Sequence, residues 1–235
     1  MAAVNRLTQH LLLVLLGGVT LRVSLGQGYL AYVQAGFRPL LVLAGALVLA
    51  VGAVGVVRSR PGADDGHPGL SVAWLLLAPV AVLLVVAPGP LGSFTAQRQA
   101  APVVAPLEGD APLGIGADDP GETHRTMTLS GYAVRTQQGD TTPLQGRSIR
   151  LVGFLSPREG GGWYVSRIRI ACCAADATAV QVVLAGDVPG AADQWVEVVG
   201  EYTPSLPHPS LGYPEPALRP VTVTPVDPPA DGYED

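Results

Sequence analysis

The chain has 235 residues, of which 48% are hydrophobic and 14% are charged, and its formal net charge is −5. Its mean hydropathy of +0.34 is high for a water-soluble protein, and the excess of apolar residues lies in the first ninety positions. The adjacent cysteines Cys172 and Cys173 exclude a scaffold held by ordinary disulfides, because neighbours bridge only through a strained ring. From Glu108 onward seventeen acidic residues outnumber eight arginines, which argues against nucleic acid as a partner.

Residues 1–90 are predicted to form a transmembrane region with three helices. Each apolar segment approaches the roughly 20 residues that cross a bilayer. The middle segment has no charged residue, and the last contains Pro79, which a membrane helix tolerates. The first carries His10 and Arg22, and a signal peptide is its alternative, although no small-x-small cleavage site follows closely. The predicted spans are residues 7–25, 39–57 and 70–87.

Arginine placement suggests an orientation for this multi-pass plasma-membrane protein. Arg6, Arg58 and Arg60 flank the first two spans on one side, which the positive-inside rule assigns to the cytoplasm. The segment after the third span, and the C-terminal domain with it, is then extracytoplasmic. Three other arginines oppose this orientation. The small residues of the middle span suit close packing, either within this chain or against another membrane protein.

Three segments follow the membrane region. Residues 91–125 are rich in Pro, Gly and Ala without a persistent period, and we predict a flexible linker. Residues 126–228 alternate short β-branched runs with Gly, Pro and Asp, the pattern of a β domain. Residues 229–235 are expected to form an acidic tail.

The β domain is predicted to be a small barrel. Residues 129–137 place apolar side chains on one helical face and are assigned to a short helix. Five short strands without a crossover helix favour an all-β, OB-like barrel, with Gly153 supplying a bend. The Pro-rich stretch around His208 is interpreted as an irregular loop. The predicted strands are residues 148–155, 163–171, 179–185, 195–203 and 219–225.

Alternation along these strands predicts which side chains form the core. The expected inward set is Ile149, Leu151, Ile168, Ile170, Val180, Val182, Leu184, Val196, Val198, Val221 and Val223. The expected outward set is Arg150, Arg167, Arg169, Gln181, Glu197 and Thr222.

The segment from Ile168 to Ala177 holds the most unusual chemistry of the chain. Alternation places Cys172 inward and Cys173 outward. Three interpretations remain open. In the first, the two thiols and Asp176, with His124 or His208, form a soft-metal or redox site. In the second, the cysteines are structural, and Cys172 is a small buried apolar residue. In the third, a thiol on the surface has a regulatory role. Asp176 taken alone is typical of a turn.

Several short motifs are spread along nearly the whole chain. They are Arg-Pro-Leu at 38–40, Trp-Leu-Leu-Leu-Ala-Pro at 74–79, Leu-Gly-Ser at 91–93, Gly-Arg-Ser-Ile-Arg-Leu-Val-Gly-Phe at 146–154, Arg-Ile-Arg-Ile-Ala-Cys-Cys-Ala-Ala-Asp-Ala at 167–177, Trp-Val-Glu-Val-Val-Gly at 195–200 and Pro-x4-Tyr-Glu at 228–234. Together they resemble the YcgQ-like permease-subunit family, and the most specific of them is Cys-Cys-x-Ala-Asp-Ala. The resemblance implies a small subunit beside a larger multi-span permease, with the family's motif at Cys172, Cys173 and Asp176.

Two functions follow as expectations. The first is a non-enzymatic accessory subunit of a membrane permease, whose outward-facing β domain binds a substrate or partner. The alternative is a membrane-anchored metal- or redox-sensing domain that uses the cysteine pair, with zinc or another soft metal as its ligand. An envelope enzyme is the remaining class, and the sequence has none of the common hydrolase, nucleotide-binding or metalloprotease motifs.

Overall fold

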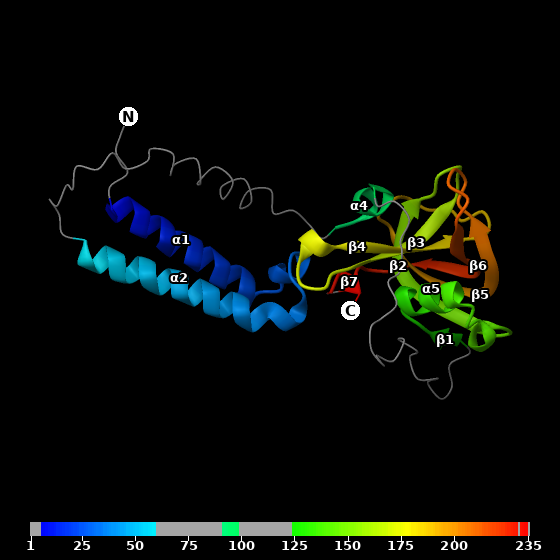
Figure 1. Cartoon of the computed structure of the whole chain (residues 1–235), viewed down its shortest axis with the longest axis horizontal. Coiled ribbons are helices and arrows are strands. Elements are labelled where there is room, and N and C mark those ends of the chain that lie inside the picture. The colour runs from blue at the N-terminus through cyan, green and yellow to red at the C-terminus, as the bar shows by residue number, and fades with distance from the viewer. Residues whose placement is uncertain (1–5, 60–90, 99–123, 230, 235) are drawn as a thin grey trace. The chain divides into compact units, whose positions relative to one another are not determined.

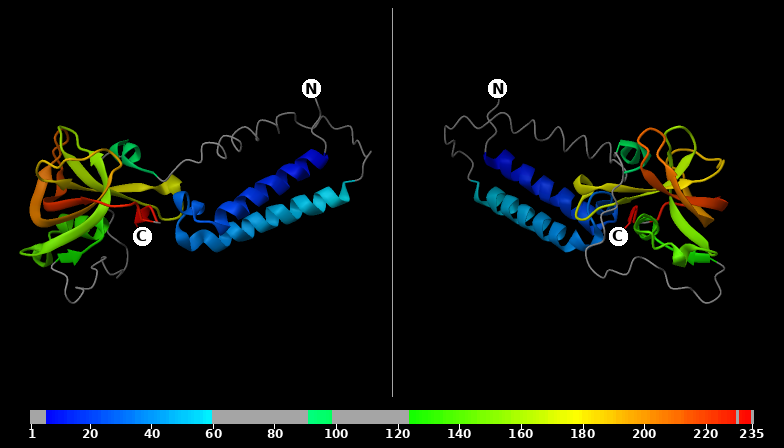
Figure 2. Two further views of the ribbon diagram at one scale, coloured as in Figure 1. Left: turned by 180° about the vertical axis from the view of Figure 1, so that it is seen from behind. Right: turned by 45° about the vertical axis from the view of Figure 1, so that its right-hand side comes forward.

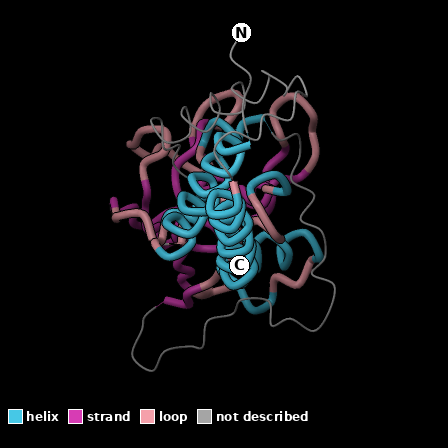
Figure 3. Tube along the Cα trace, turned by 90° about the vertical axis from the view of Figure 1, so that its left-hand side faces the viewer, coloured by secondary structure: helices cyan, strands magenta, loops and turns pink. Residues whose placement is uncertain are grey.

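Two compact units make up the chain, residues 1–90 and 91–235 (Figure 1). The structure is a computed structural model that describes residues 6–59, 91–98, 124–229 and 231–234. The predicted third span, 70–87, and most of the predicted linker lie outside the described residues. Figure 3 distinguishes helices from strands by colour, and every strand among the described residues belongs to the second unit.

The described part of the first unit is a hairpin of two apolar helices, α1 (Arg6–Leu25) and α2 (Arg38–Arg58), which lie side by side in both views of Figure 2. Two short 3-10 helices, η1 (Gly28–Ala31) and η2 (Ala35–Phe37), connect them. The Arg38 guanidinium donates hydrogen bonds to the carbonyls of Ser24 and Leu25 at 3.1 and 3.2 Å. A cation thus caps the carbonyl end of α1, where the helix dipole favours it.

One described helix is long and apolar enough to cross a membrane. It covers Ala35–Arg58, with a hydropathy of 2.8, and includes the predicted second span. A signal sequence near an N-terminus has the same length and composition. The predicted first span is also helical, but its apolar part, Gln9–Leu25, is shorter.

Glycines bring the two helices into backbone contact. A Cβ atom added to Gly17 would lie 2.5 Å from the Leu49 nitrogen, and one added to Gly52 would lie 2.7 Å from the Val14 nitrogen. Both distances are shorter than real contacts, so only glycine fits at these two positions. Packing within the chain, one of the two uses predicted for the small residues of α2, is therefore served by Gly52.

The second unit contains a closed five-stranded barrel, as predicted. Its sheet order is β1-β2-β5-β6-β4-β3-β7, and an additional β2–β3 pairing closes the ring of β2 to β6. Within the ring only the β4–β6 pairing is parallel. The strands are β1 (His124–Thr126), β2 (Ser148–Pro157), β3 (Trp163–Arg169), β4 (Thr178–Leu184), β5 (Trp195–Pro207), β6 (Pro214–Pro225) and β7 (Tyr233–Glu234).

Gly153 lies beside the point at which β2 changes its pairing partner. Strand β2 pairs with β5 up to Phe154 and with β3 from Phe154 onward. A Cβ atom at Gly153 would lie 2.5 Å from the Ser166 carbonyl oxygen. Glycine is therefore required for the close approach of β2 to β3.

The predicted inward direction of the Val221 side chain was wrong. Val199 pairs with Thr222 and Gly200 with Pro220, so Val221 is an extra residue in a β-bulge. A bulge interrupts the alternation of side chains, and Val221 is 64% exposed. The other ten residues of the inward set are buried or packed against the core, although Ile168 and Ile170 belong to a second apolar cluster.

The last two barrel strands are longer than predicted. The Pro-rich stretch that was interpreted as an irregular loop extends β5 and β6 into a hairpin, in which Leu206 pairs with Glu215 and Pro207 with Pro214. Proline cannot donate to a ladder, but at the end of a hairpin its missing N–H costs little. The connection between the strands is reduced to residues 208–213.

The predicted short helix is confirmed as α5 (Leu129–Gln138). The Thr128 hydroxyl caps its start by accepting from the Gly131 nitrogen at 3.0 Å, and Gly139 ends it with a φ of 77°. The Tyr132 hydroxyl donates to the Ala217 carbonyl at 2.5 Å. The helix is buried from Leu129 to Thr136 and packs on the barrel core.

The predicted acidic tail is part of the fold. Strand β7 pairs in parallel with β3. The buried Glu234 carboxylate accepts from the Leu129 and Ser130 nitrogens at 2.7 and 2.9 Å, and from the Ser130 hydroxyl at 2.5 Å. A carboxylate at a helix N-terminus satisfies N–H groups that have no partner within the helix. Glu234 therefore ties the C-terminal segment to α5.

The described ends of the predicted linker, 91–125, are also ordered. Helix α4 (Ser93–Arg98) packs on the barrel, and Ala96 is buried in the second apolar cluster. The Ser93 nitrogen donates to the Asp193 carboxylate at 2.6 Å, and the Leu91 nitrogen donates to the Tyr233 hydroxyl at 3.2 Å. At its other end, His124 begins β1 beside β2. These contacts were missed because such short elements show no periodicity.

Candidate metal site at the turn between β3 and β4

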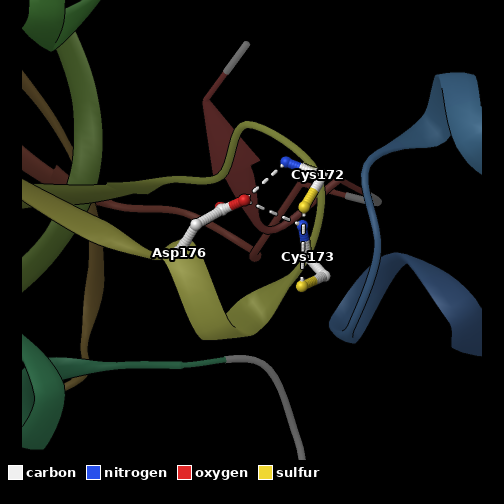
Figure 4. Close-up of side chains that lie close together, drawn as sticks. All are labelled: Cys172, Cys173 and Asp176. Atoms are coloured by element: carbon white, nitrogen blue, oxygen red, sulfur yellow. Dashed lines mark hydrogen bonds between the residues drawn. The ribbon is translucent and has the colours of Figure 1, made fainter.

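A tight turn after β3 brings Cys172, Cys173 and Asp176 together (Figure 4). The turn continues into the 3-10 helix η5 (Ala174–Asp176), which Cys173 caps. The Asp176 carboxylate accepts from the nitrogens of Ala171 and Cys172 at 2.8 Å each, and from that of Cys173 at 3.4 Å. Asp176 is thus a turn residue, as its type suggested. Its carboxylate also faces the two thiols.

The two thiols lie close together on the surface. Their Sγ atoms are 3.7 Å apart, and neither cysteine forms a disulfide. The predicted inward direction of Cys172 was wrong: Cys172 is exposed and Cys173 is half-buried. The reason is that β3 ends at Arg169, and alternation applies only within a strand. A buried structural role for Cys172 is therefore excluded.

Hydrogen bonds within the cluster shift two pKa values. The hydrogen bond with Asp176, followed by that with Cys173, raises the pKa of the Cys172 thiol to about 12. The same bond with Cys172, followed by the backbone N–H of Ala171, lowers the pKa of Asp176 to about 2. Near neutral pH the cluster therefore holds an ionised carboxylate beside a protonated Cys172 thiol.

The two sulfur atoms have the spacing that a tetrahedral metal ion requires, and the Asp176 carboxylate lies near them. One ligand atom from each of the three residues lies within 4.8 Å of the other two. Two thiolates bound to one Zn²⁺ at about 2.3 Å are about 3.8 Å apart, close to the 3.7 Å between these sulfurs. A carboxylate has about four acceptor positions. Backbone N–H groups occupy three in Asp176, and the fourth, which faces the Cys172 thiol, becomes available to a metal when that thiol loses its proton.

Neither histidine suggested as a further ligand belongs to this cluster. Among the residues that the structure describes, the metal-type group contains Cys172, Cys173 and Asp176 alone. His124 lies in β1, and His208 stacks on Tyr213 with ring centroids 4.7 Å apart. The described protein ligands thus number three, which leaves a tetrahedral ion one position for another ligand.

A polar network elsewhere on the barrel was missed by the sequence analysis. The buried Glu215 carboxylate accepts from Arg158 Nε and Nη2 at 3.0 and 2.7 Å, and from the Tyr164 hydroxyl at 2.5 Å. Its members come from distant parts of the chain, and Glu215 lies in the stretch interpreted as a loop. Neither periodicity nor spacing signals such a network.

Comparisons of the chain with protein-family models, with curated proteins and with solved structures found no match.

Proposed function

We propose that this chain is a non-catalytic, membrane-anchored accessory protein whose β-barrel binds a soft metal ion through Cys172, Cys173 and Asp176. The observation that carries the proposal is the convergence of two thiols and a carboxylate on one short turn, with all three ligand atoms within 4.8 Å. Thiolate ligands favour zinc, copper(I) and similar ions over magnesium or calcium.

The exposure of the site favours exchange over a structural role. Structural zinc sites use four protein ligands and are closed, whereas three ligands leave a position for water or an incoming group. The Cys172 side chain is exposed and Cys173 is half-buried. A metal bound here can therefore be passed to another protein or released, as a sensing or delivery domain requires.

Membrane anchoring is supported by the outer surface of the helical hairpin. Large apolar side chains of α1 and α2 that point away from their interface are about half exposed among the described residues. A helix that is apolar all round is typical of a membrane span. The glycine-lined contact between α1 and α2 also favours a retained anchor over a cleaved signal sequence. The exposed side chains include Leu11, Leu15, Leu40, Leu43, Leu47, Val51 and Val54.

The proposed role places this chain beside a multi-span permease in the plasma membrane, with three spans and the barrel outside the cell. The resemblance of the sequence motifs to the YcgQ-like permease-subunit family and the arginine pattern support it. The OB-like assignment is supported by the ring order, since numbering the barrel strands one to five gives 1-2-3-5-4-1. An OB-fold carries its helix between strands three and four, whereas α5 precedes the first, so the likeness concerns strand order alone.

A competition titration tests metal binding. The full chain is purified in detergent under reducing conditions, stripped of metal and titrated with Zn²⁺ against a chromophoric chelator. We expect one ion per chain, no tight binding in Cys172→Ser/Cys173→Ser, and weaker binding in Asp176→Asn. Asp187→Asn, which changes an exposed acid elsewhere on the barrel, is the control and should bind as the wild type does. Equal binding in the double variant would overturn the metal site.

The partner is tested separately by affinity purification from solubilised membranes. A multi-span permease recovered with the wild type, and still recovered with Cys172→Ser/Cys173→Ser, would support an accessory subunit that docks through its membrane helices. Recovery of this chain alone from membranes that contain the permease would leave the metal-sensing role and remove the permease role.

A further inference from the structure

A second concave site lies on the barrel between the β2–β3 connection, the β5–β6 connection and helix α4. It encloses about 420 Å³, a volume within the range of small-molecule sites. Its residues differ from those of the cysteine turn, so it is independent of the proposed metal site. The residues that carry the argument are Arg98, Arg158, Glu159, Tyr164, His208 and Tyr213.

Arg158 and Tyr164 form the floor of this pocket, and the buried Glu215 carboxylate behind them holds both side chains. Arg158 binds the buried Glu215 through Nε and Nη2, and Nη2 also donates to the Pro207 carbonyl at 2.8 Å. The Tyr164 hydroxyl donates a hydrogen bond to the other Glu215 carboxylate oxygen. Because the guanidinium offsets the carboxylate, the floor presents oriented polar groups without a net charge. Such a floor is rigid before any ligand arrives.

The wall of the pocket includes an oriented histidine. His208 Nδ1 accepts from the nitrogens of Ser210 and Leu211 at 3.3 and 3.2 Å. A neutral imidazole that accepts at Nδ1 carries its proton on Nε2. The Nε2 atom lies 3.8 Å from a Glu159 carboxylate oxygen. The imidazole ring also stacks on Tyr213, so the wall combines an aromatic surface with a hydrogen-bond donor.

Two further charges of opposite sign line the pocket. The Arg98 guanidinium lies over the Phe94 ring at 4.1 Å, and no carboxylate pairs with it among the described residues. Glu159 accepts from the Ser210 hydroxyl and approaches His208, but within the same described ranges no arginine pairs with it. Among the described residues, the pocket therefore offers one cation without a carboxylate partner and one carboxylate whose nearest cationic group is the His208 imidazole, at 3.8 Å.

We propose that this pocket binds a small zwitterion, of the class of free amino acids and short peptides. The ligand's carboxylate would pair with Arg98 and its ammonium group with Glu159, while its side chain would pack on Tyr213. A ligand with one charge of each sign matches both groups. A neutral sugar would leave both charges without partners, and a simple anion would face Glu159.

The test uses the full chain in detergent and the twenty free L-amino acids as separate calorimetric probes. At least one is expected to bind with one site per chain. Its N-acetyl and carboxamide derivatives, each lacking one charge, should bind at least tenfold more weakly. Binding should persist in Cys172→Ser/Cys173→Ser, which separates this pocket from the metal site.

Matched variants locate the binding. Arg98→Gln and Glu159→Gln should each weaken the best amino acid at least tenfold, while Arg219→Gln and Glu201→Gln, which change an exposed pair elsewhere on the barrel, should alter it less than twofold. All four sites are exposed, so the variants should unfold at the wild-type temperature. The proposal is overturned if no amino acid binds, if the derivatives bind as well as their parent, or if glucose or inorganic phosphate binds instead.

Discussion

Replacing Glu234 with alanine is expected to destabilise the β-barrel unit strongly. The change removes the carboxylate that accepts from the Leu129 and Ser130 nitrogens and from the Ser130 hydroxyl. Loss of a capping acceptor costs about 0.5–2 kcal/mol, and loss of a negative charge at a helix N-terminus costs about 0.3–1 kcal/mol more. The expected loss of unfolding free energy is therefore about 1–3 kcal/mol, or about 3–12 °C in Tm for a domain of this size.

Urea unfolding of the full chain in detergent measures this loss. The fluorescence of Trp163 and Trp195 reports on the barrel when Trp74, the remaining tryptophan, is replaced by phenylalanine. Glu234→Gln keeps one acceptor oxygen and should lose an intermediate amount. Asp227→Ala, an exposed acid nearby in sequence, should stay within about 0.5 kcal/mol of the wild type. The same small change in Glu234→Ala would refute the assignment of the C-terminal segment to the fold.

Three further predictions concern the helical hairpin, Gly153 and the metal site. Gly17→Ala should lower the melting temperature of the hairpin, measured by helical circular dichroism, because the new Cβ would lie 2.5 Å from the Leu49 nitrogen. Gly18→Ala is the control, since nothing lies within 4 Å of a Cβ there, and an equal loss in that variant would contradict this packing. Gly153→Ala should lower the free energy of urea unfolding by about 1–3 kcal/mol, and an unchanged urea midpoint would contradict the need for glycine between β2 and β3. Zinc affinity should fall at least tenfold for each pH unit between about pH 8 and pH 6, because the Cys172 thiol, with a pKa raised to about 12, must release its proton to bind. An affinity independent of pH would exclude Cys172 as a thiolate ligand.

The barrel was predictable because its signals are local. Alternation of β-branched side chains located all five strands, and ten of the eleven expected inward residues lie in or against an apolar core. The failures occur where alternation stops, at the Val221 bulge and after β3 at Cys172. The order of the C-terminal segment depends on contacts between Glu234 and α5, about a hundred residues earlier, which no local pattern can reveal.

The cysteine turn and the pocket also differ in how far the sequence predicts them. Cys172, Cys173 and Asp176 lie within five residues, so their meeting on one turn was predictable from their spacing alone. The pocket takes Arg98 from α4, Glu159 from the connection after β2 and His208 from the connection after β5. Only the closed barrel and the docking of α4 bring these side chains together. A site assembled from three distant segments carries no sequence signature without knowledge of the fold.

X-ray absorption at the zinc edge, on the full chain loaded with one equivalent of Zn²⁺ under reducing conditions, tests the proposed metal site most directly. The proposal predicts two sulfur ligands at about 2.3 Å, with oxygen or nitrogen ligands at about 2.0–2.2 Å completing the shell, and loss of the sulfur shell in Cys172→Ser/Cys173→Ser. A shell of oxygen and nitrogen ligands alone in the wild type would contradict it and leave the cysteine pair without a metal.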